Sequence, residues 1–230
     1  MTNLNKINQR KNICSKLDLP FYTATEEILN SITHGLGVIL SIIAFILFIK
    51  DFTGDNIKLT CGLIYSFALL ILYSVSTIYH GLKINLSKKV FRILDHCSIF
   101  LLIAGTYTPI AIISIGGAWG IIIISAVWSV AILGIILNII DLKKFAKFSM
   151  TCYITMGWAA LIAIKPILNN FSNNQVWVFF IGGILYTIGA IIYGKGKNIK
   201  YAHFIWHLFV LVGSIFHFIL IYSLYGCGPN

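Results

Sequence analysis

Long apolar segments separated by short polar connections dominate the pattern of this chain. Each segment holds roughly 20 residues, the length that an α-helix needs to cross the hydrocarbon core of a bilayer. The pattern predicts an all-α fold, a bundle of seven transmembrane helices. The expected spans are Ile28–Ile49, Leu59–Leu82, Val90–Ile113, Trp119–Ile140, Phe148–Ile164, Val176–Tyr193 and Ala202–Tyr225.

Composition agrees with a membrane protein. Hydrophobic residues make up 58% of the chain and charged residues 10%, with a mean hydropathy of +0.90, whereas a soluble domain carries about a quarter charged residues. The first 22 residues are polar and basic and lack the pattern of a signal peptide. We expect residues 1–22 to form a cytoplasmic N-terminal tail and residues 23–230 to form the seven-helix domain of a multi-pass cell-membrane protein.

The Lys and Arg residues predict the orientation of this bundle. The N-terminal stretch and the second, fourth and sixth connections carry four, four, three and three of them, fourteen in all, against three on the other side. Such an excess marks the cytoplasmic face. We therefore expect the N-terminus in the cytoplasm and the C-terminus outside. Although the formal charge is +10, the cations lie in short clusters rather than in one stripe, so no nucleic-acid partner is expected.

Four ionisable residues are expected at one depth, just inside the cytoplasmic surface. His80, Asp95 and His203 each lie three residues from a Lys or Arg at the end of an expected span, and His207 follows His203 by one helical turn. Ionisable residues inside a membrane are costly, so a coplanar cluster of them indicates a functional site.

The types of these residues are those of an open zinc site. Three imidazoles, from His80, His203 and His207, leave a fourth ligand position for water, which is typical of catalytic zinc. The stretch from His203 to His207 lacks the Glu of the His-Glu-x-x-His proteases. Asp95 is therefore the expected carboxylate partner of the water. Ser76 lies one turn before His80 on the same helical face, and we expect it to position the substrate or its oxyanion.

Other interpretations compete with a zinc site. The polar residues could form a packing network, or two histidines could bind a haem. His34 and His96 are interpreted as interfacial or hydrogen-bonded histidines, and His217, too far along its helix to join the cluster, as a hydrogen-bonding residue near the outer leaflet. Thr23 and Glu26 match a capping box, so Glu26 and the adjacent Glu27 are interpreted as stabilising a helix N-terminus.

At these residues the chain resembles the hemolysin III family, the bacterial branch of the progestin and adipoQ receptor superfamily. The matching stretches extend over nearly the whole chain. They are residues 26–35 (EEILNSITHG), 76–80 (STIYH), 92–109 (RILDHCSIFLLIAGTYTP), 203–207 (HFIWH) and 216–218 (FHF).

This resemblance implies a seven-helix bundle with a cytoplasmic N-terminus. It implies zinc held by His80, His203 and His207, with Asp95 contacting the zinc-bound water and Ser76 beside the site. Eukaryotic relatives include receptors for adiponectin or progestins and proteins thought to hydrolyse ceramide amides, and bacterial members are linked to membrane lipid homeostasis. We therefore expect a zinc-dependent hydrolase of membrane lipid amides or esters, with a membrane lipid as its substrate or ligand. The alternatives are a cytolytic, membrane-perturbing protein with structural zinc, and a receptor-like sensor of a metal or ligand.

Overall fold

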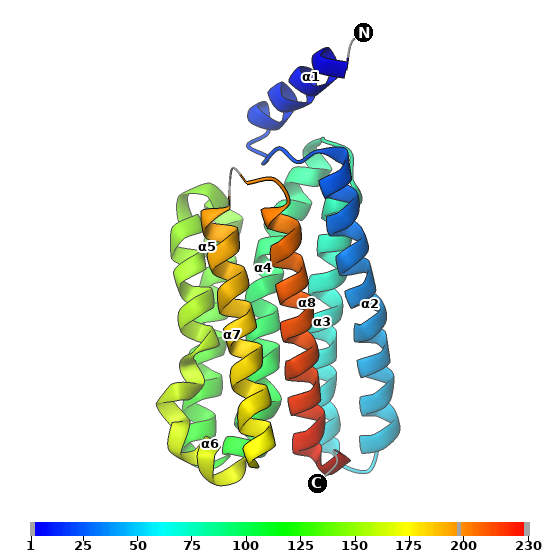
Figure 1. Ribbon diagram of the computed structural model, residues 1–230. Coiled ribbons are helices and arrows are strands. Elements are labelled where there is room, and N and C mark those ends of the chain that lie inside the picture. The colour runs from blue at the N-terminus through cyan, green and yellow to red at the C-terminus, as the bar shows by residue number, and fades with distance from the viewer. Residues whose placement is uncertain (1–2, 197–198, 228–230) are drawn as a thin grey trace.

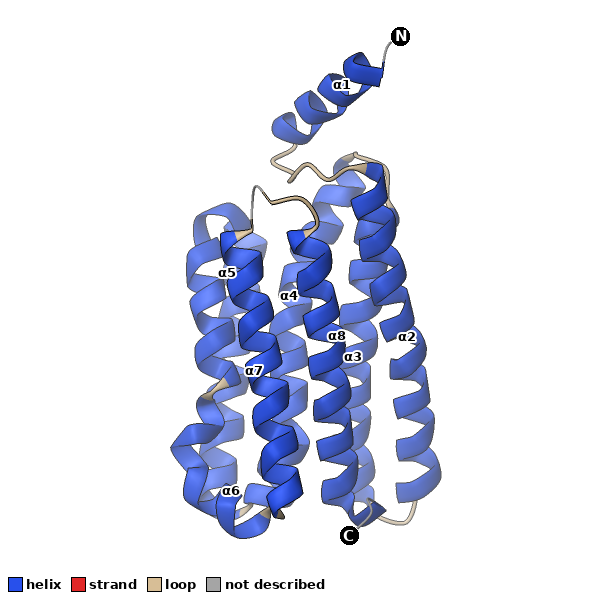
Figure 2. Ribbon diagram, viewed as in Figure 1, coloured by secondary structure: helices blue, strands red, loops and turns tan. Residues whose placement is uncertain are grey.

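The computed structural model describes residues 3–196 and 199–227, and over these residues the chain is helical, with no strand (Figure 2). The all-α prediction is confirmed. The elements are α1 (Asn3–Lys16), α2 (Ala24–Phe52), α3 (Asn56–Gly81), α4 (Leu86–Pro109), a π-helix (Ile110–Ile115), α5 (Gly117–Gly157), a 3-10 helix (Ala159–Ala163), α6 (Ile164–Asn170), α7 (Asn173–Lys195), α8 (Ala202–Tyr222) and a second π-helix (Ser223–Cys227).

The long helices form a closed bundle, with the two ends of the chain at opposite ends of it (Figure 1). Helix α2 packs on α3, α3 on α4, α4 on α5, and α7 on α8, and the contact of α8 with α2 closes the ring. Within the described residues, six helical stretches are long and apolar enough to cross a membrane. Many isoleucines face outward, such as Ile121, which is 67% exposed. An outer surface of this kind suits hydrocarbon.

One of the six stretches contains a reversal of the chain direction. One stretch, Gly117–Asn170, has 54 residues, and inside it Asp141 has non-helical φ and ψ of −159° and 92°. Ser149 Oγ donates a hydrogen bond of 2.6 Å to Asn138 Oδ1, although 11 residues of continuous helix span about 16 Å. The chain therefore turns back at Asp141, as the ribbon of α5 does in Figure 1. The expected fourth and fifth spans are thus joined by a turn of almost no length.

Two local features add detail to the sequence-based expectation. The helix after Asp141 begins before the expected span Phe148–Ile164, and α5 ends at Gly157, where the 3-10 helix and then α6 follow. The expected N-terminal tail, residues 1–22, contains the 14-residue helix α1. An apolar group that includes Cys14, Leu19 and Tyr79 packs this region on the end of α3.

Two connections follow the sequence closely. Gly116 and Gly117, in the turn before α5, have φ of 62° and 53°, a conformation that residues with a Cβ rarely adopt. Thr23 and Glu26 form the expected capping box at the start of α2, with Thr23 N donating to Glu26 Oε2 at 2.9 Å and Glu26 N donating to Thr23 Oγ1 at 3.3 Å. Glu26 Oε1 also accepts from the backbone N–H of Tyr201 at 2.9 Å. The carboxylate thereby joins the starts of α2 and α8.

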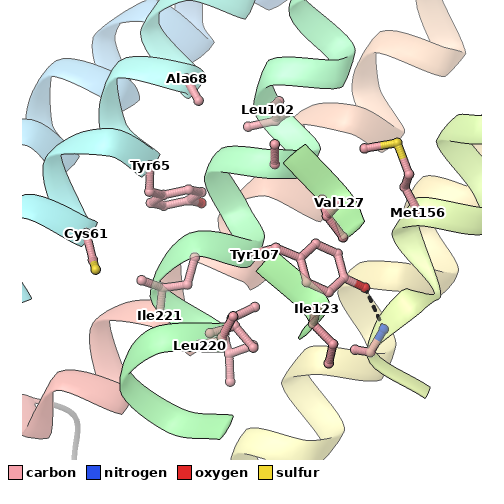
Figure 3. Packing of buried hydrophobic residues seen from close by; sticks show 14 of the residues in the cluster. Cys61, Tyr65, Ala68, Leu102, Tyr107, Ile123, Val127, Met156, Leu220 and Ile221 are labelled. Atoms are coloured by element: carbon pink, nitrogen blue, oxygen red, sulfur yellow. Dashed lines mark hydrogen bonds between the residues drawn. The ribbon is translucent and has the colours of Figure 1, made fainter. Parts of the chain in front are cut away.

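The middle and the far end of the bundle hold a tightly packed apolar core, part of which is shown in Figure 3. Tyr65 and Leu220 are completely buried in this core. Tyr107 satisfies its hydroxyl by accepting from Ala160 N and donating to Gly157 O, both at 2.9 Å. These bonds tie α4 to the irregular chain after α5.

Candidate metal centre

Three histidines converge at the end of the bundle where α1 lies. His80 is in the last turn of α3, while His203 and His207 are in the first two turns of α8. His203 Nε2 lies 3.2 Å from His80 Nε2 and 3.0 Å from His207 Nε2. All three potential ligand atoms are within 4.8 Å of one another. The structure therefore brings together the three histidines that the sequence selected.

The distances between these nitrogens fit a metal ion. Nitrogens bound to zinc at 2.0–2.1 Å in a tetrahedral arrangement lie about 3.3–3.4 Å apart. The observed distances of 3.0 and 3.2 Å between Nε2 atoms are close to that value. A neutral imidazole that donates through Nδ1 has only a lone pair on Nε2. Partners at Nδ1 favour this tautomer for His80 and His207, whereas His203 Nδ1 has no partner among the described residues. A shared cation would satisfy the Nε2 atoms that face one another, so the group could hold a metal ion.

Glu27 orients His80 for this role. Its Oε2 lies 2.7 Å from His80 Nδ1, so the Nδ1–H donates to the carboxylate and Nε2 is left free. A carboxylate on the far nitrogen of a metal-binding histidine fixes the tautomer and the ring orientation. Our interpretation of Glu27 as a helix-terminal acid missed this contact. The available signal was the spacing of Glu27, Asn30 and His34, which lie on one face of an otherwise apolar helix.

Lys88 of α4 completes this connection. Its side chain is buried, and its Nζ lies 2.9 Å from Glu27 Oε1. Nζ also donates to the carbonyl oxygens of Tyr79 at 2.7 Å and Leu82 at 3.1 Å, at the C-terminus of α3. From its sequence position this lysine was expected among the charges of the cytoplasmic surface. In the structure it is an internal residue that joins α2, α3 and α4.

His34 and Asn30 support the opposite side of the centre. His207 Nδ1 lies 3.4 Å from the Asn30 carbonyl oxygen, which can accept its proton. The His34 ring stacks on His207 with centroids 3.6 Å apart and an angle of 13° between the planes. His34 is 3% exposed, and neither of its ring nitrogens has a hydrogen-bond partner in the described part of the chain. The interpretation of His34 as an interfacial or hydrogen-bonded residue is therefore wrong.

The other two histidines lie outside the group. His96 is hydrogen-bonded as expected, because its Nδ1 lies 2.9 Å from the Arg92 carbonyl oxygen and its Nε2 lies 3.3 Å from the Tyr193 hydroxyl. His217 lines a cavity of about 90 Å³ deeper in the bundle. Within the described residues its ring nitrogens make no hydrogen bond, contrary to the expectation.

Asp95 is not part of the group of mutually close ligand atoms, and Ser76 is near its carboxylate. Ser76 is completely buried on α3. Its side chain is close enough to interact with the Asp95 carboxylate, although its Oγ makes no hydrogen bond of ordinary geometry in the described part of the chain. The Asp95 side chain is 13% exposed, with Oδ2 3.9 Å from His96 Nδ1. Their catalytic roles stay predictions.

Tyr22, in the segment between α1 and α2, lies against the histidines. Its ring stacks on His203 with centroids 4.9 Å apart and lies 5.9 Å from the His80 ring. Burial raises the pKa of the Tyr22 phenol well above its usual range, so this group stays neutral. Residues of α4 and α5 hold the same segment. Lys143 Nζ lies 2.9 Å from Asp18 Oδ1, and Arg92 donates to the Asp18 carbonyl oxygen.

Comparison with known proteins points to one family. The profile of the family described as "Haemolysin-III related" matches residues 22–218. The chain is 42% identical over 203 residues to "Hemolysin-3" of Bacillus cereus, covering 86% of this chain and 92% of that protein. It is 40% identical over 195 residues to the "Hemolysin-3 homolog" of Bacillus subtilis (strain 168), covering 84% and 91%. A more distant relative is the human "Monocyte to macrophage differentiation factor", 26% identical over 208 residues, covering 87% and 85%.

Proposed function

Since the chain belongs to the haemolysin-III-related family of multi-pass membrane proteins, we propose that it is a zinc-dependent hydrolase of amide or ester bonds in membrane lipids. The observation that carries this proposal is the convergence of His80, His203 and His207 through their Nε2 atoms. Three histidine ligands with an open fourth position are typical of zinc hydrolases. An apolar bundle around the site favours a lipid as the substrate.

Seven crossings with a cytoplasmic N-terminus belong to the same proposal. The reversal at Asp141 divides the 54-residue stretch into two segments, since about 20 residues suffice for one crossing. Seven crossings place the two ends of the chain on opposite sides. The fourteen Lys and Arg residues expected on one side then assign the end of the bundle with α1 to the cytoplasm. The three histidines accordingly lie in the inner leaflet.

The residues around the site supply the remaining chemistry. Zinc, when bound by the histidines, supplies Lewis acidity toward a carbonyl oxygen and increases the acidity of water. Asp95 accepts the proton of the attacking water and returns it to the leaving group. Ser76, beside Asp95, donates a hydrogen bond to the substrate oxygen. Glu27 holds the Nδ1 proton of His80, and Tyr22 restricts access of bulk water to the histidines.

Metal content is the first test of this function. The full chain, purified in detergent, would be analysed by elemental mass spectrometry, with His203→Ala/His207→Ala as the variant. His217→Ala is the matched control, because it removes a buried histidine of the same helix about 15 Å away from His207. We expect about one zinc per chain in the wild type and the control, and loss in the double variant. Wild-type protein that contains no metal would refute the site.

Hydrolysis is tested with the same proteins in liposomes that contain ceramide and phospholipid. We expect release of fatty acid by the wild type and the His217→Ala control. The double histidine variant should be inactive, whereas Asp95→Asn should keep its metal and lose a factor of about 10²–10⁴ in rate. Full lipid turnover by the double histidine variant would refute a metal-dependent hydrolase.

Membrane perturbation is the second candidate function, favoured by the names of the two Bacillus relatives, "Hemolysin-3" and "Hemolysin-3 homolog". It makes a different prediction for the same samples. Wild-type protein would release a dye trapped in liposomes without releasing fatty acid. If the double histidine variant still causes leakage, the histidines have a structural role or no role in membrane perturbation.

A further inference from the structure

A pocket lined in part by His80 opens at the end of the bundle where α1 lies. Its volume is about 560 Å³, within the range of about 300–1,000 Å³ that is usual for small-molecule sites. It lies between α1, the first turns of α2 and the connection from α3 to α4, and its lining includes Glu27 and His80. A ligand in this pocket therefore reaches the group that orients the candidate metal centre and one of its three histidines.

Two cations belong to the lining of this pocket. Arg10 comes from α1 and Lys83 from the connection after α3. Lys83 is exposed and forms no ion pair with any described residue, and Arg10 lies over the Phe21 ring at 6.0 Å from its centroid. Glu27 is the one carboxylate in the lining, and it is already paired with His80 and Lys88. The two cations are consequently available to an anionic ligand.

The opposite part of the lining is apolar and leads toward the lipid. Ile28 and Ile32 line the pocket from α2 and, four residues apart, lie on one face of that helix. Each is 58% exposed at the outer surface of the bundle. Ile13 of α1, which is 38% exposed, adds to the same apolar surface. The apolar part of the lining thus continues onto the exposed surface of α2, along which an acyl chain would meet hydrocarbon.

We propose that this pocket binds an anionic amphiphile of the inner leaflet, with Arg10 and Lys83 contacting its anionic group and Ile28 and Ile32 contacting its acyl chain. The anionic group is a phosphate diester of a phospholipid or the carboxylate of a fatty acid, since guanidinium and ammonium groups recognise both. The statement that this ligand is the substrate or product of the site rests on the proposed function. The statement that the pocket binds it does not.

The test compares lipids that differ in charge. The full chain in neutral detergent would be titrated with radiolabelled dioleoylphosphatidylglycerol, oleate or dioleoylphosphatidylcholine, for wild type and Arg10→Gln/Lys83→Gln. Lys147→Gln/Lys195→Gln is the control, because both lysines are exposed, one in α5 after its turn at Asp141 and one at the end of α7, and neither lines the pocket. We expect the pocket variant to bind at least one anionic lipid about tenfold or more weakly. The pocket variant should bind phosphatidylcholine as the wild type does, and the control variant should bind all three lipids as the wild type does.

A steric variant tests the pocket without changing its charge. Ala24 lines the pocket and is exposed, whereas its neighbour Thr25 is exposed but does not line it. Ala24→Trp should therefore reduce binding of the anionic lipid, and Thr25→Trp should not. Selective loss for phosphatidylglycerol identifies a phospholipid head group, and selective loss for oleate identifies a fatty acid.

Failure of this inference and failure of the proposed function are distinguishable. Equal binding of all three lipids to wild type and to the charge variant would overturn the inference, even if the protein contained zinc and hydrolysed lipid. Equal weakening for phosphatidylcholine would also overturn it. Charge-selective binding in a protein without metal or hydrolytic activity would support the pocket and refute the hydrolase.

Discussion

The ion pair between Glu27 and Lys88 joins the candidate centre to the packing of three helices, and its removal leads to a quantitative prediction. The change is Lys88→Met, which keeps the length and apolar part of the side chain but removes the charge. The Lys88 side chain is 2% exposed and that of Glu27 is 13% exposed, with Nζ 2.9 Å from Oε1. Loss of the lysine therefore leaves a carboxylate with little access to water.

The expected cost follows from the geometry. At 2.9 Å and an effective dielectric constant of about 20, two unit charges attract by roughly 6 kcal/mol, and most of this offsets the desolvation of the two groups. Removal of one partner of a buried pair typically costs about 3–5 kcal/mol. His80 still donates to Glu27 at 2.7 Å, so we expect Lys88→Met to destabilise the protein by about 3 kcal/mol. Glu27→Gln removes the unpaired charge, so in the double variant the two effects should not add.

The assay is a double-mutant cycle on the free energy of unfolding. Unfolding of the full chain in mixed micelles would be followed by tryptophan fluorescence after chelation, so that metal binding does not contribute to the measured stability. Lys88→Arg is the matched control that keeps the charge. We expect a coupling energy of about 2 kcal/mol between Glu27→Gln and Lys88→Met. Additivity within about 0.5 kcal/mol would refute the reasoning, because that is the behaviour of independent sites.

Two further predictions concern packing and the N-terminal segment. Gly134→Ala should destabilise the protein by about 1–3 kcal/mol, because an added Cβ would lie 2.1 Å from Phe100 Cζ. Gly157→Ala is the control, because a Cβ at that position would have no neighbouring atom within 4 Å. Equal thermal denaturation of the two variants would contradict the predicted clash. The hydrogen bond from Lys143 lowers the pKa of Asp18 below 3.8, so this tether contributes above that pKa and is lost as the pH falls through it. Titration of Asp18 by NMR should give a higher pKa in Lys143→Gln, and an unchanged pKa would show that the contact does not form.

Hydrophobic length predicts the long helices of this chain because a bilayer requires a fixed apolar length. The expected span Leu59–Leu82 corresponds to α3, Asn56–Gly81, and Val176–Tyr193 lies within α7, Asn173–Lys195. The turn at Asp141 was expected to be a longer connection, because the basic residues after it were interpreted as a loop. Polar residues at a membrane surface form a helix as readily as a loop, so charge alone does not separate the two.

The sequence predicts the part of the candidate site that lies on one helix, where two histidines are four residues apart. It does not predict how residues of other helices are placed beside them. His203 and His207 lie on one face of any helix that contains both, so their proximity follows from local geometry. The position of His80 beside them depends on the packing of α2, α3 and α8. Asp95 was expected at the same depth from its distance to a cation, but depth does not specify the direction in which a side chain points.

Glu27 and Lys88 illustrate why charges at a membrane surface are ambiguous in a sequence. An acid in the first turn of a helix is stabilised by the helix dipole, and a lysine after an apolar segment is stabilised by water, so each has a sufficient local explanation. The structure turns both side chains inward, where burial is tolerable only because the charges meet each other, His80 and the last carbonyl groups of α3. A network of this kind costs stability if any member is removed. Substitution of a member of this network should therefore lower both the free energy of unfolding and the affinity for metal.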